Sequence, residues 1–244
     1  MIPLTRHGWR EMLIGAAVLA LMAWVMGVVI PWLALLVVPV LIWLFLFFRD
    51  PHRMVPGEQS VMVSPADGKV SDINEIASEP LLGGGPAVRV GIFLSVFNVH
   101  VNRSPCDGKV LDIKYKKGKF INAMRHTQAS DENESNTAVL GDPVSGQPVA
   151  VVKQIVGLIA RRIIFTPQVG QLVSRGQRIG MIKFGSRTEL IIPRSLEPEI
   201  VVKVGQMVRG GSDIVARLGK PVHTSVERVD DSEAETMAPR HSPA

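Results

Sequence analysis

Three side chains on three predicted turns have the types needed for nucleophilic chemistry. Ser186 ends the stretch FGS, where two strand-like runs meet at Gly185. His100 lies in the strand-like run FLSVFNVHVNRSP, and Asp67 lies in the turn SPADG. A hydroxyl, an imidazole and a carboxylate can act as nucleophile, general base and orienting group when a fold brings them together. The set therefore predicts a nucleophilic site built on turns.

Each of these residues also has an ordinary structural explanation. A serine in a turn is usually a turn residue, and a histidine in an apolar strand is usually a packed core or edge residue. An aspartate in Pro-x-Asp-Gly stabilises the turn by itself, and a second copy of this turn carries Asp107. Only the three residues taken together favour catalysis.

Two pairs of internal repeats indicate how the fold is built. SPADGKVSDI at residues 64–73 returns as SPCDGKVLDI at residues 104–113, and VGQLVSRGQRI at residues 169–179 returns as VGQMVRGGSDI at residues 204–214. Short Val/Ile-rich runs separated by Gly, Pro, Asn and Asp fill the rest of the chain beyond Phe48. We expect a mainly β, repeat-built fold with barrel-sandwich-like strands.

The first 48 residues differ from the rest. Residues 12–48 contain no charged side chain. One straight helix of that length would measure about 55 Å, well beyond a hydrocarbon core of about 30 Å, so the run must break, with Pro31 and Pro39 as the obvious positions. Basic residues flank both ends, which predicts an α-helical hairpin that returns the chain to the cytoplasm. A cleaved signal peptide is the competing interpretation, but the run is too long for its apolar region.

The chain thus divides into three parts. We expect residues 1–48 to form a membrane-associated helical hairpin that spans the bilayer or dips into it. Residues 49–221 are expected to form a β-rich catalytic domain. Residues 222–244 have almost no apolar periodicity, which predicts a disordered tail.

Charge and composition narrow the partners. The net charge of +5 permits nucleic acid or an anionic membrane surface. All four Trp lie in the first 48 residues, so few aromatic side chains remain for base stacking, and nucleic acid is not expected. Cys106 is the single cysteine, which excludes an intrachain disulfide, and no Cys/His cluster has the spacing of a zinc site. We expect no bound metal and a reducing, cytosolic environment.

Two polar segments could lie near the site. KYKKGK at residues 114–119 either faces an anionic membrane or is a solvated loop. TQASDENESNT at residues 127–137 is expected to be a polar loop, either a lid over the site or disordered.

The same residues allow two functional interpretations. The second repeat pair is similar to the halves of a biotinyl/lipoyl-type carrier, in which a hairpin between the halves presents a modified lysine. Lys183 lies near that position, but the tip of the expected hairpin is Gly185-Ser186, which predicts an exposed Ser186. The other alternative is a membrane-anchored serine hydrolase that keeps Asp67, His100 and Ser186 as a stable triad and one uncut chain.

Three motifs in this order resemble the signatures of the phosphatidylserine decarboxylase family. They are SPADG at residues 64–68, FNVHVNR at residues 97–103 and FGS at residues 184–186. The shorter bacterial and archaeal form fits best, over roughly residues 45–220. The combination behind an apolar N-terminus is specific, although each piece alone is weak. Some relatives have a second histidine where this chain has Phe97, so a role for that histidine in substrate handling does not carry over.

The resemblance implies a proenzyme that cleaves itself between Gly185 and Ser186. It assigns Asp67 and His100 as the self-processing dyad, with His100 taking the hydroxyl proton of Ser186. Ser186 is then converted to a covalent pyruvoyl group, so no separate cofactor is needed. That group forms a Schiff base with the substrate's amine and accepts the electrons released with carbon dioxide. His100 is also expected to donate a proton in the decarboxylation.

The resemblance also implies partners and location. The substrate is phosphatidylserine and the product phosphatidylethanolamine, so the enzyme serves phospholipid biosynthesis. The two chains, residues 1–185 and 186–244, are expected to stay together as a heterodimer that could oligomerise further. We expect it at the cell membrane with its catalytic domain on the cytoplasmic face.

Overall fold

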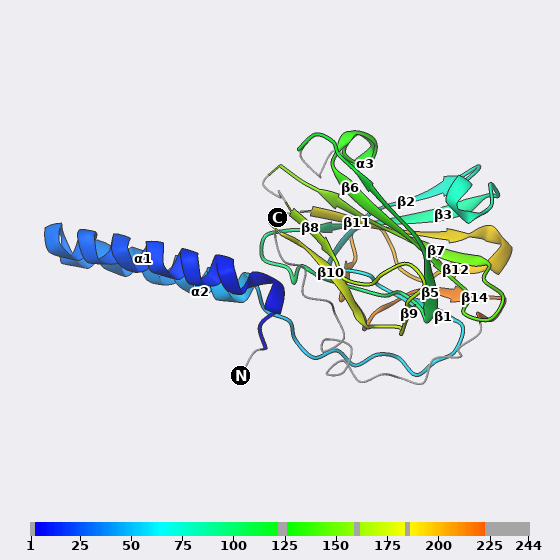
Figure 1. The fold of residues 1–244 in the computed structure, drawn as a ribbon, viewed down its shortest axis with the longest axis horizontal. Coiled ribbons are helices and arrows are strands. Elements are labelled where there is room, and N and C mark those ends of the chain that lie inside the picture. Colours follow the sequence, from blue (N-terminus) through cyan, green and yellow to red (C-terminus); the bar gives the residue numbers. More distant parts are fainter. Residues whose placement is uncertain (1–2, 122–125, 159–161, 184–185, 223–244) are drawn as a thin grey trace.

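A pair of helices projects from a β domain in the computed structural model (Figure 1), which describes residues 3–121, 126–158, 162–183 and 186–222. Helices α1 (Trp9–Val29) and α2 (Val37–Phe47) lie side by side and antiparallel, with a short 3-10 helix, η1 (Arg6–Gly8), before them. The segment from Arg6 to Val28 is long and apolar enough to cross a membrane. The predicted helical hairpin is present, and its membrane insertion remains a proposal.

The apolar run breaks at Pro31, one of the two positions expected. Ile30 has extended backbone, with φ −143° and ψ 93°, and a 3-10 helix, η2 (Pro31–Leu36), leads the chain back into α2. Pro39 causes no break because it lies in the first turn of α2, where a missing N–H removes no bond from the helix interior.

The β domain contains three antiparallel sheets. The largest has eight strands in the order β13-β2-β3-β11-β7-β6-β5-β9, and two three-stranded sheets have the orders β1-β14-β12 and β4-β10-β8. The strands are β1 (Val61–Val63), β2 (Gly68–Ile76), β3 (Ala87–Leu94), β4 (Val101–Arg103), β5 (Gly108–Lys116), β6 (Ser135–Gly141), β7 (Pro148–Val156), β8 (Arg162–Phe165), β9 (Leu172–Val173), β10 (Arg178–Lys183), β11 (Ser186–Pro193), β12 (Pro198–Ile200), β13 (Met207–Val208) and β14 (Ile214–Leu218). Short helices η3 (Pro80–Leu82), α3 (His126–Glu132) and η4 (Arg194–Leu196) complete the described elements. The mainly β prediction is confirmed.

The sequence repeats reappear as two similar halves of the sheets. β2 and β5 follow the two Pro-x-Asp-Gly turns, and each has a register shift at the same place, before Asp72 and before Asp112. β13 pairs with β2 as β9 pairs with β5. The eight-stranded sheet is therefore palindromic about its central pair, β11 and β7, and the two three-stranded sheets correspond strand for strand.

This arrangement assigns the strands to two repeats. One repeat consists of β1 to β3 and β11 to β14, and the other consists of β4 to β10. The chain leaves the first repeat between β3 and β4 and returns to it between β10 and β11. The main core lies inside these sheets and contains side chains from both repeats, such as Val90, Ile92, Leu140 and Leu190.

The polar segment at residues 127–137 is not the loop we expected. Its first residues belong to α3 and its last to β6, and Ser130, Asn133 and Ser135 are buried. The Asn133 side chain accepts a hydrogen bond from the Ile121 backbone N–H and donates to the backbone carbonyls of Ile121 and Val156. Polar side chains in this segment form hydrogen bonds with backbone N–H and carbonyl groups instead of facing water. The polar composition of the segment did not predict this burial. The segment at residues 114–119 is exposed, and the expected tail beyond Val222 lies outside the described residues.

Candidate functional site

The connection from β3 to β4 lies beside the end of β10 and the start of β11. His100 ends the connection from β3 to β4, and its carbonyl accepts a hydrogen bond of 3.2 Å from the Ile182 N–H in β10. Ser186 begins β11 and pairs in register with Leu94, the last residue of β3. The fold thus places Ser186 and His100 where the chain crosses between two sheets. Gly185 lies outside the described residues.

Ser186 is buried, and its hydroxyl has no hydrogen-bond partner within the described part of the chain. Our expectation of an exposed serine at a hairpin tip was wrong. β10 pairs with β4 and β8, whereas β11 lies between β3 and β7, so the two strands belong to different sheets and form no hairpin. A buried polar group without a partner costs about 1–3 kcal/mol, so an unpaired hydroxyl at this position calls for an explanation, and a catalytic role is one.

His100 is a buried, neutral imidazole. Its Nδ1 lies 2.9 Å from the Asn98 carbonyl, and the Phe47 ring packs against it with centroids 4.2 Å apart. Because a carbonyl only accepts, Nδ1 carries the proton and Nε2 is the nitrogen with the lone pair. Burial, and to a lesser extent the positive charge of Arg49, lowers the pKa of His100 to about 4. The imidazole can therefore accept a proton at neutral pH.

Asp67 lies in a positively charged setting. Its carboxylate accepts from the Gly210 N–H at 2.8 Å and forms an ion pair with Arg53 at 2.6 Å. Burial raises the pKa of Asp67, against the opposing effects of Arg53, the Gly210 N–H and Arg49. Arg49 thus influences the titration of both Asp67 and His100. The direct pairing of Asp67 with His100 stays a prediction, since these contacts engage the carboxylate elsewhere.

Asp107, in the second Pro-x-Asp-Gly turn, has the same structural role as Asp67 but, among the described residues, does not pair with Arg53. Asp107 accepts from the Arg175 N–H at 2.8 Å. Arg175 and Gly210 occupy the same position in the second pair of sequence repeats. Each Pro-x-Asp-Gly turn is therefore fastened to the loop that follows its partner strand, and the ion pair with Arg53 distinguishes Asp67.

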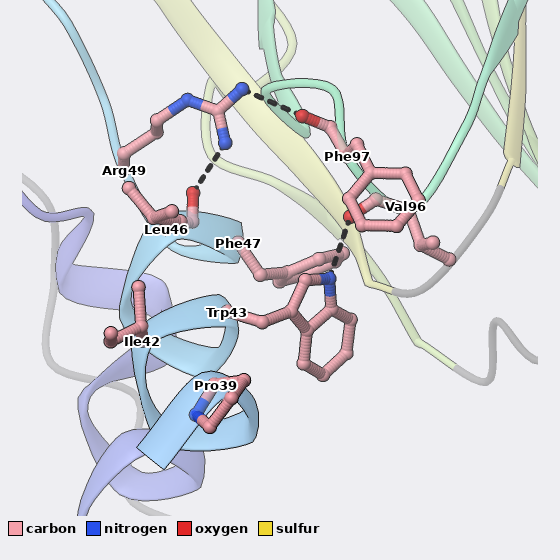
Figure 2. Close-up of a pocket in the computed structure, with 8 residues that line it drawn as sticks. All are labelled: Pro39, Ile42, Trp43, Leu46, Phe47, Arg49, Val96 and Phe97. Atoms are coloured by element: carbon pink, nitrogen blue, oxygen red, sulfur yellow. Dashed lines mark hydrogen bonds between the residues drawn. The ribbon is translucent and has the colours of Figure 1, made fainter.

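A groove runs between α2 and the connection from β3 to β4 (Figure 2). Its volume is roughly 460 Å³. Two side chains of the helical region fasten its walls: Trp43 Nε1 donates to the Val96 carbonyl at 3.3 Å, and Arg49 donates to the carbonyls of Phe97 and Leu46 at 2.7 and 2.6 Å. The full lining is Pro39, Ile42, Trp43, Leu46, Phe47, Arg49, Val96 and Phe97.

The base of the helical hairpin is packed onto the site. Phe47 and Phe48 are fully buried in a cluster with Met181 of β10. Lys183, at the end of β10, is buried and pairs with Glu11 of α1 at 2.6 Å. A carrier lysine must be presented to a partner enzyme, so this buried pairing speaks against a carrier module modified at Lys183.

Sequence reasoning missed several residues of the site. Arg49 and Arg53 were interpreted only as flanking charges that set membrane topology, and Phe47 only as part of an apolar run. A buried polar network was also missed: Asn102 donates to Thr188 at 3.1 Å and accepts from Gln154 at 2.9 Å. Thr188 shares the Ser186 face of β11, because alternate residues of a strand face the same side. The FNVHVNR motif contained the signal for Asn102.

No cluster of three or more His, Cys, Asp or Glu side chains that could hold a metal occurs among the residues that the structure describes.

Comparison with known proteins identifies the family. A family model described as phosphatidylserine decarboxylase matches residues 40–216. A phosphatidylserine decarboxylase proenzyme of Rhodopirellula baltica is 43% identical over 221 residues, which cover 88% of each chain. A proenzyme of the same name from Symbiobacterium thermophilum is 43% identical over 218 residues, covering 88% of this chain and 95% of the relative. The matched residues 40–216 include Asp67, His100 and Ser186, and the chain belongs to the phosphatidylserine decarboxylase family.

Proposed function

We propose that this chain cuts itself between Gly185 and Ser186 and then decarboxylates phosphatidylserine to phosphatidylethanolamine with a pyruvoyl group derived from Ser186. One observation carries the proposal: the Ser186 hydroxyl is buried at the start of β11 with no partner in the described chain. A hydroxyl kept in that state is suited to attack the carbonyl that precedes it. The relatives' description as proenzymes supports the same reading.

The cut can be written with the chain's own atoms. Ser186 Oγ attacks the Gly185 carbonyl while neutral His100 takes the hydroxyl proton; His100 then passes that proton to the nitrogen of residue 186, the C–N bond breaks and an ester remains. Glycine has no side chain to crowd that carbonyl. Loss of the Cα proton of residue 186 and breakage of its Cβ–O bond then release the 1–185 chain as a carboxylate. The dehydroalanine that remains at residue 186 is then hydrolysed: its nitrogen leaves as ammonia, and the oxygen of water becomes the ketone oxygen of the pyruvoyl group.

The site suits the group that results. A pyruvoyl carbonyl supplies an electron sink for a substrate amine that loses carbon dioxide. The face of β11 that carries Ser186 is shielded from water, which strengthens electrostatic effects on reacting charges. His100 is the proposed proton donor to the decarboxylated product, and Asp67 the second member of the dyad.

The groove of Figure 2 is the proposed place for part of the lipid. Its wall on α2 is apolar, as an acyl chain requires, and Arg49 at its end offers positive charge to the phosphate. We propose that the hairpin holds the enzyme at the cytoplasmic face of the cell membrane, where anionic lipids attract a basic protein.

Cleavage of the purified protein tests the proposal. Wild type should contain two chains, residues 1–185 and 186–244, and the smaller should resist Edman degradation because a pyruvoyl terminus has no amine. Ser186→Ala should stay uncut and inactive. Ser186→Cys should cut slowly, because a thiol can make the same acyl shift. The control Ser195→Ala, at an exposed serine, should behave as wild type. An intact wild-type chain with a free Ser186 hydroxyl and decarboxylase activity would refute this mechanism, and hydrolytic activity from an uncut chain would favour the serine hydrolase.

A further inference from the structure

A buried cluster of charges lies on the face of β11 opposite Ser186. Arg187 is fully buried, and its guanidinium binds Asp72 at 2.7 Å, Glu189 at 2.9 Å and Ser71 at 2.5 Å. Asp72 and Ser71 lie at the register shift of β2, and such bulges re-aim side chains. We call Ser71, Asp72, Arg187 and Glu189 the Arg187 cluster. It fixes the side chain of the residue directly after Ser186.

The sheet makes room for this guanidinium. Gly91 of β3 pairs with Glu189 on one side and Asp72 on the other. A Cβ at position 91 would lie 2.0 Å from Arg187 Nη2. The absence of a side chain at Gly91 is therefore a requirement of the Arg187 cluster.

The second repeat shows that the fold itself does not require these charges. Val139 occupies the position equivalent to Gly91, since it pairs with Asp112 as Gly91 pairs with Asp72. Val151 pairs with Val139 as Glu189 pairs with Gly91. Both valines are buried in an apolar cluster. Buried charges seldom stabilise a fold more than apolar residues of similar volume do, so the charges at β11 call for a local reason.

That reason lies in what the proposed cut does to β11. Before the cut, residue 186 is held by its bond to residue 185. After the cut it is the first residue of a chain, and chain ends fray. A reacting carbonyl that moves by about 1 Å can lose about a hundredfold in rate. Because neighbouring side chains of a strand face opposite sides, Arg187 can be gripped without obstructing the Ser186 face.

We propose that Arg187 is a positioning residue, which holds the new amino-terminal end of the 186–244 chain in the sheet after self-cleavage. The inference rests on the proposed function. It predicts that the Arg187 cluster matters little for the cut, when the chain is still continuous, and much for the decarboxylation that follows.

The test replaces Arg187 and Glu189 with apolar residues, because the second repeat has apolar side chains in the equivalent region. In Arg187→Met/Glu189→Val, no acid is left fully buried and unpaired, because Asp72 keeps Ser71 and Asn74 as partners. We expect the variant to be cut as completely as wild type on a denaturing gel. Its kcat on phosphatidylserine should fall about tenfold to a hundredfold with KM little changed. Arg194→Met, which removes an exposed ion pair with Glu75 near the other end of β11, should leave kcat unchanged.

Hydrogen exchange separates positioning from general weakening. The amides of Thr188 to Leu190 should exchange faster in the double variant than in wild type once the chain is cut. In a Ser186→Ala background, which keeps the chain continuous, the variant and its parent should exchange alike. Equal acceleration in both backgrounds, or an unchanged kcat in the cut variant, would overturn the inference.

A second variant covers the case in which the double variant does not fold. Gly91→Ala leaves every charge in place and displaces only the end of the Arg187 side chain. It should also be cut normally and lose kcat, and wild-type kcat in this variant would count against the inference. Two failures can be told apart. If wild type itself is not cut, the proposed function is wrong. If the Arg187 variant is cut and keeps its activity, only the inference about Arg187 is wrong.

Discussion

At the scale of single residues, His100 is the proposed base, and it is fully buried. Its surroundings lower its pKa to about 4, so it is neutral over the whole physiological range. An ordinary histidine, with a pKa near 6.5, would be partly charged there. The first step of the proposed cut requires a base that is neutral at physiological pH, and His100 meets that requirement.

The first prediction is a pH profile for self-cleavage. The rate for freshly translated proenzyme should stay level from about pH 8 to about pH 5 and fall through about pH 4, where His100 becomes protonated. The control His52→Gln, at an exposed histidine, should not change the profile. A fall centred near pH 6.5 would mean that His100 is not the buried base described here.

The lowered pKa of His100 also makes the folded protein less stable as the pH falls. The folded pKa of His100 lies below its unfolded value, so the unfolded state takes up the proton first as the pH falls. His100 therefore lowers the free energy of unfolding progressively from about pH 6.5 to about pH 4.

Residue types could be predicted from the sequence, and residue environments could not. Ser186, His100 and Asp67 were chosen because hydroxyl, imidazole and carboxylate are the groups for nucleophilic chemistry. That Ser186 is buried, and that Phe47 packs against His100, depends on elements far apart in sequence. No local pattern contains that information.

At the scale of elements, the two Pro-x-Asp-Gly turns offer a controlled comparison. Asp107→Asn should change the free energy of unfolding little, since the amide oxygen can still accept the Arg175 N–H, whereas Asp67→Asn also removes the ion pair with Arg53 and should lower that free energy by about 1–3 kcal/mol. Only Asp67 also pairs with Arg53 and lies near Arg49. Asp67→Asn should therefore block or greatly slow the cut, and Asp107→Asn should allow it.

Denaturant unfolding and gel analysis of both variants measure the two effects. Equal cleavage in the two would remove Asp67 from the mechanism.

The elements also show which patterns carry structural information. The repeats predicted a repeat-built β fold correctly, because each repeat folds locally into a turn and a strand. The hairpin expected at Gly185 was wrong, because strand pairing is decided by long-range partners and each of β10 and β11 finds its own two neighbours. α3 was missed because its polar residues have buried partners that composition does not show.

At the scale of the whole molecule, the helical hairpin forms one wall of the groove, and we propose that it is also the membrane anchor. The full chain should remain in the membrane pellet after alkaline carbonate washing, and a chain lacking residues 1–48 should be released. The sequence alone suggested that this truncation leaves the site able to form. The structure leads us to expect a slower cut, because Phe47 covers His100 and Glu11 pairs with Lys183.

Sedimentation and the extent of cleavage check both parts of this prediction. Release of the full chain by carbonate would show that the hairpin is not inserted, and wild-type cleavage of the truncated chain would show that its base does not shape the site.

Because β11 is a central strand of the largest sheet, the molecule should fold more readily before the proposed cut than after it. While the chain is whole, β11 meets β3 and β7 at the effective concentration of a tethered segment, which is in the millimolar range for short flexible tethers. Once residues 186–244 are a separate chain, the same strand can return to the sheet only by meeting another molecule, so recovery from denaturation slows with dilution. Under the proposed mechanism the uncut chain is therefore the form that folds, and the two chains left by the cut can restore the sheet only by associating with each other.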